Sequence, residues 1–303
     1  MKLNRRECLR LLAAAGVFTI APSLTNIAPQ ILRRSIPSTG EALPSIGLGT
    51  WKTFNVGRSA KERMPQHNVL QNLLAHGGAA VDTSPMYGQS EAVIGDLAAE
   101  NNFNNELFIA TKVWTTGQQE GIAQMNNSFS LLKRDVIDLM QVHNLVDWNT
   151  HYKTLRKWKE EGKIKYIGIT HYVNSAHEEM EQIIKSVPMD FIQINYSITA
   201  RNIENRLLRV AEERNVAVMI NQPYNGGSIF RLNQGKKVPA WAAEFDCSTW
   251  PEFYLKYILA DPAVTCIIPG TSDPIHMTEN MMAGVGRLPN ETQRKKMIQY
   301  VES

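Results

Sequence analysis

The sequence predicts an α/β fold in which strands and helices alternate and eight parallel strands close into a single (β/α)8 barrel. Two observations carry this prediction: short runs rich in β-branched residues recur along the chain, and segments with helical spacing of apolar residues separate them. Eight repeats of this kind allow a parallel sheet to close on itself. The runs fall at residues 46–50, 79–82, 107–112, 136–142, 164–169, 191–194, 217–220 and 265–268.

Helical spacing is clearest in four of the intervening segments, where apolar residues recur three or four positions apart. These residues are Val69, Leu70, Leu73 and Leu74; Ile122, Met125, Phe129 and Leu132; Leu155 and Trp158; and Met180, Ile183 and Ile184. An open, doubly wound sheet is the structural alternative. It is disfavoured because no strand is followed by the Gly-x-Gly-x-x-Gly turn that a dinucleotide-binding fold of that kind needs.

The length and composition fit one globular domain over residues 29–303. The chain has 303 residues, of which 43% are hydrophobic and 20% charged, and α/β barrels commonly reach this size as one domain. A segment with proline, serine and glycine, residues 33–44, leads into the first predicted strand, and no linker follows it.

Residues 1–28 have the pattern of an export signal, because several basic side chains precede the apolar stretch 11–21. The pair Arg5-Arg6, followed by leucines and alanines, resembles the twin-arginine signal that directs folded bacterial proteins across the inner membrane. We therefore expect the twin-arginine export machinery as a partner, cleavage near Ala28, and a periplasmic or otherwise exported protein. The alternative is a basic tail on a cytoplasmic enzyme. The apolar stretch is shorter than the roughly 20 residues that span a bilayer, so no stable membrane anchor is predicted.

The positive charge of the chain belongs to this N-terminal segment. Residues 1–28 hold four basic residues and one acidic residue, a net charge of +3 that equals the formal charge of the whole chain. The remaining body is neutral, so nothing argues for nucleic acid, whose binding normally needs a clustered basic face.

Two cysteines, Cys247 and Cys266, lie in the predicted barrel. An oxidising compartment would permit a disulfide between them. Cys266 lies within the apolar run 264–268, however, and this position favours a buried free thiol.

Four titratable side chains follow or end predicted strands, which is where (β/α)8 barrels carry their reacting groups. Asp82 ends the second strand and Tyr87 follows it by five residues, Lys112 ends the third strand, and His143 directly follows the fourth.

In this order and in these surroundings, the four residues resemble the catalytic tetrad of the aldo-keto reductase family, and the resemblance covers nearly everything after the signal. It extends to Gly47-Leu48-Gly49-Thr50-Trp51 in the first strand, to Ile268-Pro269-Gly270-Thr271-Ser272 near the end, and to Glu279-Asn280. Membership would imply a TIM barrel enzyme, an NAD(P)H-dependent oxidoreductase that reduces an aldehyde or ketone by hydride transfer.

Carbonyl reduction explains why these residue types occur together, because a proton donor is needed where negative charge develops on the oxygen. Tyr87 is the expected general acid, and the ammonium of Lys112 is expected to lower its pKa. Asp82 is expected to keep Lys112 charged, and His143 to donate a hydrogen bond to the carbonyl oxygen.

The resemblance also implies where the nicotinamide binds. Its carboxamide would contact Thr170, His171 and Gln193, and here Thr170-His171 replaces the family's usual Ser-Asn. The aromatic residue that often stacks on the nicotinamide is replaced by Asn221, and we expect Tyr224 to compensate.

The ADP half of the cofactor is expected after the last strand, where donors of Gly270, Thr271 and Ser272 would hold phosphate near a helix N-terminus. Gly270 and His276 stand where the family often has the lysine and arginine that bind the 2′-phosphate of NADP(H). NADP(H) is nevertheless favoured over NAD(H). The same resemblance assigns the adenine to Glu279 and Asn280.

The segment 226–247 is too long for a simple barrel turn, so we expect it to fold over the pyrophosphate, with disorder as the alternative. Trp51 and Trp114 follow strands and are expected to shape an apolar pocket for a small carbonyl substrate. Tyr152, Trp158 and Trp241 are interpreted as packing residues.

No metal site is predicted, because the remaining histidines lack ligand spacing and are interpreted as surface or structural residues. They are His67, His76, His151 and His177. Two other functions stay open: a nucleotide-binding barrel that acts as a redox sensor or accessory subunit without turnover, and a non-redox barrel enzyme such as an isomerase. The sequence does not predict the oligomeric state.

Overall fold

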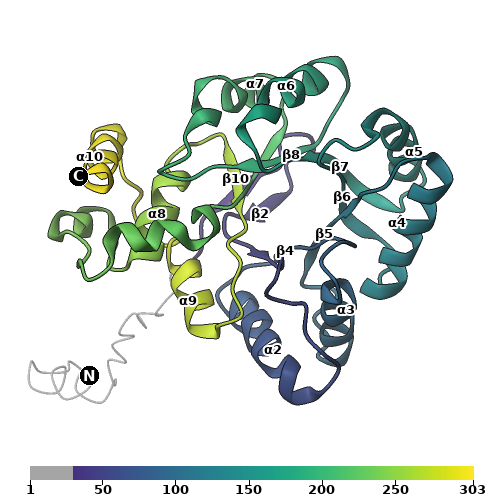
Figure 1. The fold of residues 1–303 in the computed structure, drawn as a ribbon, viewed down its shortest axis with the longest axis horizontal. Coiled ribbons are helices and arrows are strands. Elements are labelled where there is room, and N and C mark those ends of the chain that lie inside the picture. Colours follow the sequence, from purple (N-terminus) through teal and green to yellow (C-terminus); the bar gives the residue numbers. More distant parts are fainter. Residues whose placement is uncertain (1–29) are drawn as a thin grey trace, which may run out of the picture.

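The computed structural model describes residues 30–303 and contains the predicted barrel (Figure 1). Within this part of the chain, one sheet of eight parallel strands runs in the sequence order of the strands, and bridges from Ile46 to Ile267 and from Gly49 to Gly270 join its two edges. The predicted (β/α)8 fold is therefore confirmed. The strands are β3 (Leu48–Gly49), β4 (Ala80–Asp82), β5 (Phe108–Val113), β6 (Ile137–His143), β7 (Ile164–Thr170), β8 (Phe191–Asn195), β9 (Ala217–Asn221) and β10 (Val264–Ile267). The predicted signal segment, residues 1–28, lies outside the described residues.

Helices surround the strands and cover their outer faces (Figure 1). They are α2 (Ala60–Ala75), α3 (Ser90–Glu100), α4 (Gln118–Leu132), α5 (Trp148–Glu160), α6 (His177–Ser186), α7 (Leu207–Glu213), α8 (Trp250–Leu259) and α9 (Pro274–Met282), and α10 (Glu291–Glu302) lies outside this ring. The four segments with predicted helical spacing fall in α2, α4, α5 and α6. Their apolar residues face the strands because burial of one face stabilises an amphipathic helix.

Local sequence sets where these helices begin. At the start of α2, the Ser59 side chain accepts from the Glu62 amide and the Glu62 side chain accepts from the Ser59 amide. Asn290 and Gln293 form the same reciprocal cap at the start of α10. Each cap satisfies backbone donors that the first helical turn leaves without partners.

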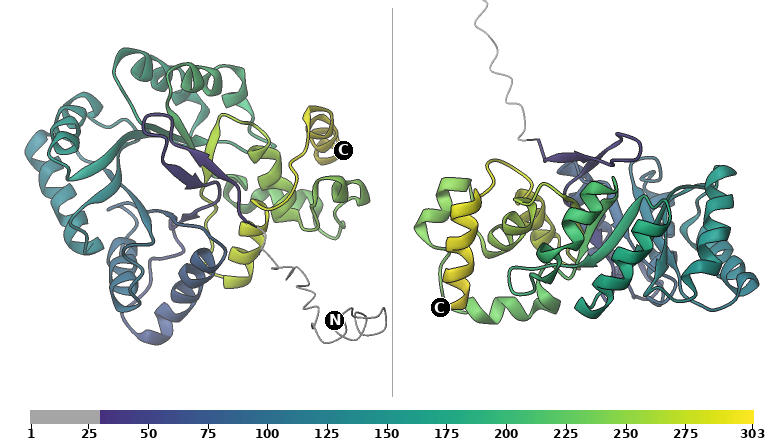
Figure 2. Two further views of the ribbon diagram at one scale, coloured as in Figure 1. Left: turned by 180° about the vertical axis from the view of Figure 1, so that it is seen from behind. Right: turned by 90° about the horizontal axis from the view of Figure 1, so that it is seen from above.

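A short hairpin that the sequence did not predict closes the N-terminal end of the barrel (Figure 2, where it crosses the strands). Its strands are β1 (Arg33–Ser35) and β2 (Ala42–Pro44). Ile36 and Leu43 of the hairpin are buried against Phe108, Tyr166 and Phe191, which lie inside the barrel near the starts of their strands. This end of the barrel is filled by apolar and aromatic side chains, so the opposite, C-terminal end is left for ligand binding.

Several smaller predictions can be compared with the described residues. The segment 226–247 contains most of η3 (Asn225–Asn233), a 3-10 segment kinked at Gly226 and Gly227, and the 3-10 helix η4 (Ala240–Phe245), so the alternative of disorder was wrong. Cys247 and Cys266 are buried and free, as favoured from the sequence. Tyr152 and Trp158 are buried and Trp241 is partly buried, which confirms them as packing residues. In residues 30–303, no helix has the length and apolarity needed to span a membrane.

Replacing Ile36 by alanine is expected to lower the free energy of unfolding by about 2–5 kcal/mol, because it removes a fully buried side chain and leaves a cavity in the hairpin seal. Urea unfolding of the two proteins measures this difference. Ile275, which is 69% exposed, is the matched control, and Ile275→Ala should change stability by no more than about 0.5 kcal/mol. Equal losses for the two variants would show that the hairpin is not part of the cooperative core.

Candidate active site

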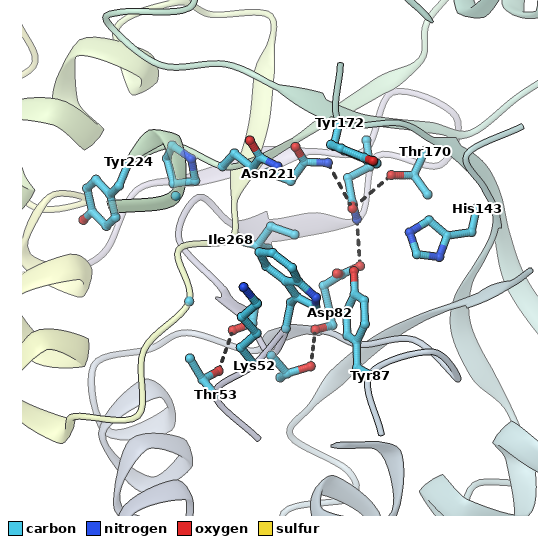
Figure 3. A pocket seen from close by; sticks show the side chains of 18 of the residues that line it. Lys52, Thr53, Asp82, Tyr87, His143, Thr170, Tyr172, Asn221, Tyr224 and Ile268 are labelled. Atoms are coloured by element: carbon cyan, nitrogen blue, oxygen red, sulfur yellow. Dashed lines mark hydrogen bonds between the residues drawn. The ribbon is translucent and has the colours of Figure 1, made fainter. Parts of the chain in front are cut away.

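A cavity of about 700 Å³ opens at the C-terminal ends of the barrel strands (Figure 3). Asp82 from the end of β4, His143 from the end of β6 and Tyr87 from the loop between β4 and α3 line one end of it. Gly270, after β10, lines it as well. The cavity therefore collects residues that lie far apart in the sequence, as the barrel topology requires.

A buried ion pair lies beneath this end of the cavity. Lys112 Nζ is 2.7 Å from Asp82 Oδ2, and it also donates to the Thr83 carbonyl oxygen at 2.7 Å. Strand register explains the contact: Asp82 pairs with Ala110 across β4 and β5, so Lys112 lies two residues further toward the rim and on the same face. The two side chains are 0% and 4% exposed.

The environment keeps Lys112 charged in spite of this burial. Burial by itself lowers the pKa of Lys112, but the negative charge of Asp82 and the hydrogen bond to it, together with the nearby Tyr87 hydroxyl, outweigh it and leave the pKa above its ordinary value. The predicted role of Asp82 as the partner that holds the ammonium agrees with this geometry.

Tyr87 lies directly beside the ion pair. Lys112 Nζ is 5.0 Å from the centroid of the Tyr87 ring, and the ring meets His143 edge to face at a centroid separation of 6.1 Å. Gly88, with φ of +62°, provides the turn that follows Tyr87 in the loop. The structure thus brings the four predicted tetrad residues, Asp82, Tyr87, Lys112 and His143, together.

Lys112 does lower the pKa of Tyr87 as expected, but the net direction of the shift is the opposite one. The sequence suggested that the neighbouring ammonium lowers the pKa of Tyr87, whereas burial of the ring raises this pKa and outweighs the opposing effect of Lys112, with the Asp82 charge raising it further. Tyr87 is therefore a protonated phenol near neutrality in the ligand-free protein.

His143 is a neutral imidazole. Burial, followed by the charges of Lys112 and His171, lowers the pKa of His143 to about 3. Its Nδ1 lies 3.3 Å from Ser84 Oγ. The ring itself borders the cavity, so Nε2 is the nitrogen left to meet a ligand.

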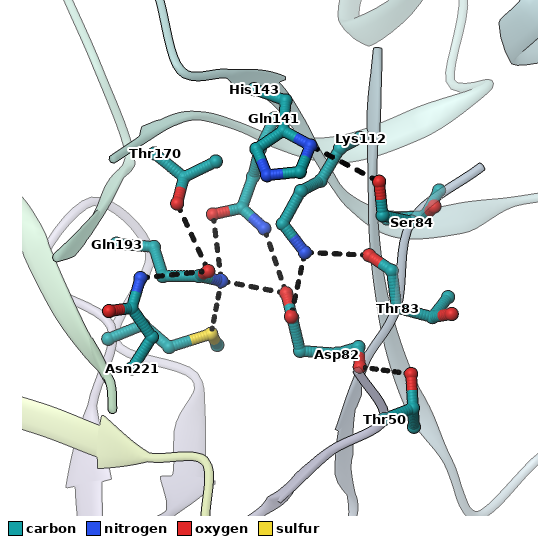
Figure 4. A network of polar contacts seen from close by, with 12 residues as sticks. Thr50, Asp82, Thr83, Ser84, Lys112, Gln141, His143, Thr170, Gln193 and Asn221 are labelled. Carbon is teal, nitrogen blue, oxygen red and sulfur yellow. Dashed lines mark hydrogen bonds and ion pairs between the residues drawn. The ribbon is translucent and has the colours of Figure 1, made fainter. Parts of the chain in front are cut away.

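A network of amides holds the other oxygen of Asp82 (Figure 4). Gln193 Nε2 donates to Asp82 Oδ1 at 2.7 Å and Gln141 Nε2 donates to the same oxygen at 3.2 Å. The sequence reasoning missed Gln141. The available signal was a polar side chain in a buried strand, two residues before His143 and so on the same face of β6.

The residues predicted for the nicotinamide also line the cavity. They are Thr170, His171, Gln193, Asn221 and Tyr224. Thr170 Oγ1 donates to Gln193 Oε1 at 3.0 Å, and Asn221 Nδ2 donates to the His171 carbonyl oxygen at 2.9 Å. Asn221 Oδ1 is buried and has no hydrogen-bond partner within residues 30–303.

Tyr224 does not lie where a ring compensating for Asn221 would be needed. It is at the end of the cavity away from Tyr87 (Figure 3), its hydroxyl donates to Asn280 Oδ1, and its ring packs against Phe230 at a centroid separation of 4.9 Å. This position joins Tyr224 to the region assigned to adenine and not to the region assigned to the nicotinamide.

The residues assigned to the ADP half lie beyond this end of the cavity. Thr271 and Ser272 follow β10, and His276, Glu279 and Asn280 lie on α9. None of these five residues borders the cavity, although Asn280 reaches it through Tyr224. Gly226, Gly227 and Phe230 of the segment 226–247 do border it, at the same end as Tyr224.

Apolar side chains surround the mouth of the cavity near the tetrad. Trp51 and Trp114 line it as predicted and are 52% and 41% exposed. The structure adds Met86 and Tyr172, which are also exposed at the rim. Lys52 also lines the cavity and carries a positive charge, and its Nζ lies 4.2 Å from the Trp51 ring centroid.

The lining fits a nicotinamide nucleotide. Amide and hydroxyl groups gather beside the tetrad, and the partnerless acceptor Asn221 Oδ1 matches the need of a carboxamide NH2 for a hydrogen-bond acceptor. In the described part of the chain, no three His, Cys, Asp or Glu side chains cluster in a way that could bind a metal ion. His151 is buried, with Nε2 2.7 Å from the Thr115 carbonyl oxygen, and so is a structural residue.

Comparisons with known proteins agree on the family. The model described as "Aldo/keto reductase family" matches residues 45–295. The aldo-keto reductase YhdN of Bacillus subtilis is 28% identical over 228 residues, covering 70% of this chain and 66% of YhdN. The methylglyoxal reductase DkgA of Salmonella typhimurium is 30% identical over 137 residues, covering 44% of this chain and 47% of DkgA. The matched part thus spans between about half and two thirds of these curated relatives.

Solved structures share the fold. An aldo-keto reductase from Klebsiella pneumoniae, crystallised in complex with NADPH, superposes with a TM-score of 0.73 at 21% identity. The superposition covers 91% of this chain and 96% of that one.

The buried neutral state of His143 predicts a dependence of stability on pH. Because the pKa of His143 is about 3 when folded and about 6.5 when unfolded, the unfolded protein binds one more proton between these values. The free energy of unfolding should therefore fall by about 1.4 kcal/mol for each pH unit below about 6.5 through this residue. His143→Asn should show a shallower slope by that amount, measured by urea unfolding from pH 8 to pH 4.5. At pH 8 the histidine is neutral in both states, so this pH is the reference, and parallel curves would contradict the assignment.

Proposed function

This chain belongs to the aldo/keto reductase family, and we propose on that premise that it is an NAD(P)H-dependent oxidoreductase that reduces an aldehyde or ketone. The observation that carries the proposal is the buried Lys112–Asp82 ion pair beside the Tyr87 phenol, at the wall of a cavity of about 700 Å³ that the residues assigned to the nicotinamide also line.

Tyr87 is the general acid in this proposal. A bound reduced nicotinamide supplies the hydride. As the carbonyl oxygen gains negative charge it becomes far more basic than a phenolate, so the Tyr87 hydroxyl gives up its proton to that oxygen. The raised pKa of Tyr87 keeps this proton in place until then. The Lys112 ammonium, 5.0 Å from the ring centroid, stabilises the phenolate that remains.

His143 orients the carbonyl. A neutral imidazole carries one N–H, and with Nδ1 beside Ser84 Oγ the cavity side of the ring can donate to the carbonyl oxygen from Nε2. Neutrality matters because a cationic ring would compete with Tyr87 as the acid. Burial enforces this neutrality.

The substrate is a small carbonyl compound with an apolar body, since Trp51, Met86, Trp114 and Tyr172 surround the mouth. Small aldehydes are the first compounds to test, because one relative is named as a methylglyoxal reductase. NADP(H) is proposed in preference to NAD(H). Support comes from similar solved structures in complex with NADPH or NADP, although Gly270 and His276 supply no strong cation for a 2′-phosphate.

Export through the twin-arginine machinery is the proposed route to the periplasm, supported by Arg5-Arg6 and the apolar stretch that follows. A compartment without its own nicotinamide supply requires the cofactor to be bound before translocation. Export of a folded chain makes this possible.

Tyr87→Phe should lower kcat for a small aldehyde by about 10²- to 10⁴-fold, because it removes the proton donor and leaves the cavity intact. The measurement is NADPH oxidation by purified protein, with cofactor binding checked separately and expected to persist. Tyr300→Phe, on α10 outside the cavity, is the control that should keep wild-type turnover. Unchanged turnover in Tyr87→Phe would refute the role of Tyr87 as the general acid. Binding of NADPH without turnover by the wild type would favour the redox sensor or accessory subunit.

Replacing Arg5 and Arg6 together by lysine should abolish export, because lysine keeps the charge and loses the guanidinium pair of the signal. Immunoblots of periplasmic and cytoplasmic fractions measure the distribution, and the N-terminal sequence of the periplasmic form gives the cleavage position. Mass spectrometry of nucleotide released from the periplasmic protein tests whether cofactor travels with it. Equal export of the double variant would rule out this pathway.

A further inference from the structure

We propose that Gln141 is a positioning residue that couples the Asp82–Lys112 pair to the carboxamide-binding side of Gln193. The inference rests on the proposed function, since it concerns how the nicotinamide is held. It assigns a role to a side chain that touches neither cofactor nor substrate: Gln141 is fully buried and does not border the cavity.

Three side chains form a closed polar triangle at the floor of the site (Figure 4). Gln141 Nε2 donates to Asp82 Oδ1 at 3.2 Å, Gln193 Nε2 donates to the same oxygen at 2.7 Å, and Gln193 Nε2 also reaches Gln141 Oε1 at 3.3 Å. Gln141 therefore uses its amide at both ends, as a donor to Asp82 and as an acceptor from Gln193.

The charge of Asp82 decides which way both amides point. A carboxylate only accepts hydrogen bonds, so each glutamine must turn its NH2 group toward Asp82 Oδ1. The other oxygen, Oδ2, is occupied by Lys112 at 2.7 Å. With the Gln193 NH2 group directed at Asp82 and Gln141, the Gln193 carbonyl oxygen must point the opposite way.

That carbonyl oxygen lies among residues of the cavity wall. Gln193 Oε1 accepts from Thr170 Oγ1 at 3.0 Å and from Asn221 Nδ2 at 3.4 Å, and all three residues border the cavity. An acceptor held in this orientation suits the NH2 group of a carboxamide, which would take the place of the longer bond from Asn221. Through Gln141, the orientation of the Gln193 side-chain amide depends on the Asp82–Lys112 ion pair that lies beside Tyr87.

A purely structural role for Gln141 makes a different prediction. If Gln141 only fills space in the barrel, its replacement by methionine, a residue of similar length, weakens every ligand of the site equally. If Gln141 orients Gln193, the replacement weakens only those ligands that use the Gln193 acceptor.

The test compares NADP+ with its 3-acetylpyridine analogue, in which a methyl ketone replaces the carboxamide and the NH2 group is missing. Isothermal titration calorimetry gives both dissociation constants for the full chain and for Gln141→Met. In the wild type, NADP+ should bind about tenfold more tightly than the analogue, the value of one hydrogen bond. In Gln141→Met this ratio should fall to about twofold or less, because the Gln193 NH2 group loses its bond to Gln141 Oε1, and the bond to Asp82 that remains leaves the Gln193 acceptor less firmly positioned.

Thr265→Val is the control, since it removes one buried hydrogen bond of a barrel strand, from the Val218 amide to Thr265 Oγ1, and leaves the triangle untouched. It should keep the wild-type ratio. If Gln141→Met does not fold, Gln141→Asn keeps the amide, loses the reach to Asp82, and is judged by the same ratio.

An unchanged ratio in a folded Gln141 variant, with both constants raised equally, overturns the proposed coupling while leaving the proposed function standing. Failure of the wild type to bind either dinucleotide overturns the proposed function, and the coupling with it.

Discussion

The site depends on one buried ion pair, Lys112 with Asp82. Two opposite charges at 0% and 4% exposure need further hydrogen-bond partners to persist, and here the Thr83 carbonyl and the amides of Gln141 and Gln193 supply them. Removing one partner of such a pair typically costs about 3–5 kcal/mol, because the other charge is left uncompensated. The pair therefore fixes the positions around it as well as the charge beside Tyr87.

Barrel architecture separates the parts of the molecule that stabilise it from the parts that bind ligands. At the N-terminal end, the hairpin seals the interior with Ile36 and Leu43 against aromatic rings. At the C-terminal end, strands that are distant in sequence end side by side and bring Asp82, Lys112 and His143 within reach of Tyr87. Trp51, Trp114 and Tyr172 shape the entrance from segments that follow the strands, apart from the hairpin seal.

Desolvation sets the protonation states of the site in opposite directions for different groups. It raises the pKa of Tyr87, lowers that of His143 to about 3, and is overcome at Lys112 by the neighbouring negative charge. The result is a phenol with its proton, with an ammonium on one side and a neutral imidazole on another. This combination suits a single proton transfer to an oxygen that becomes basic during reduction.

The sequence by itself determined the alternation of strands and helices, the eight strand positions, and the strand-end residues Asp82, Lys112 and His143, because periodicity and punctuation are local properties. Only the tertiary structure decided that the segment 33–44 forms a sealing hairpin, that Tyr224 joins Asn280 instead of the nicotinamide side, and that burial outweighs Lys112 in setting the pKa of Tyr87. It also showed that Gln141 belongs to the site. Each of these facts depends on which distant segments meet and how much water they exclude, and neither the spacing nor the type of residues along one chain specifies that.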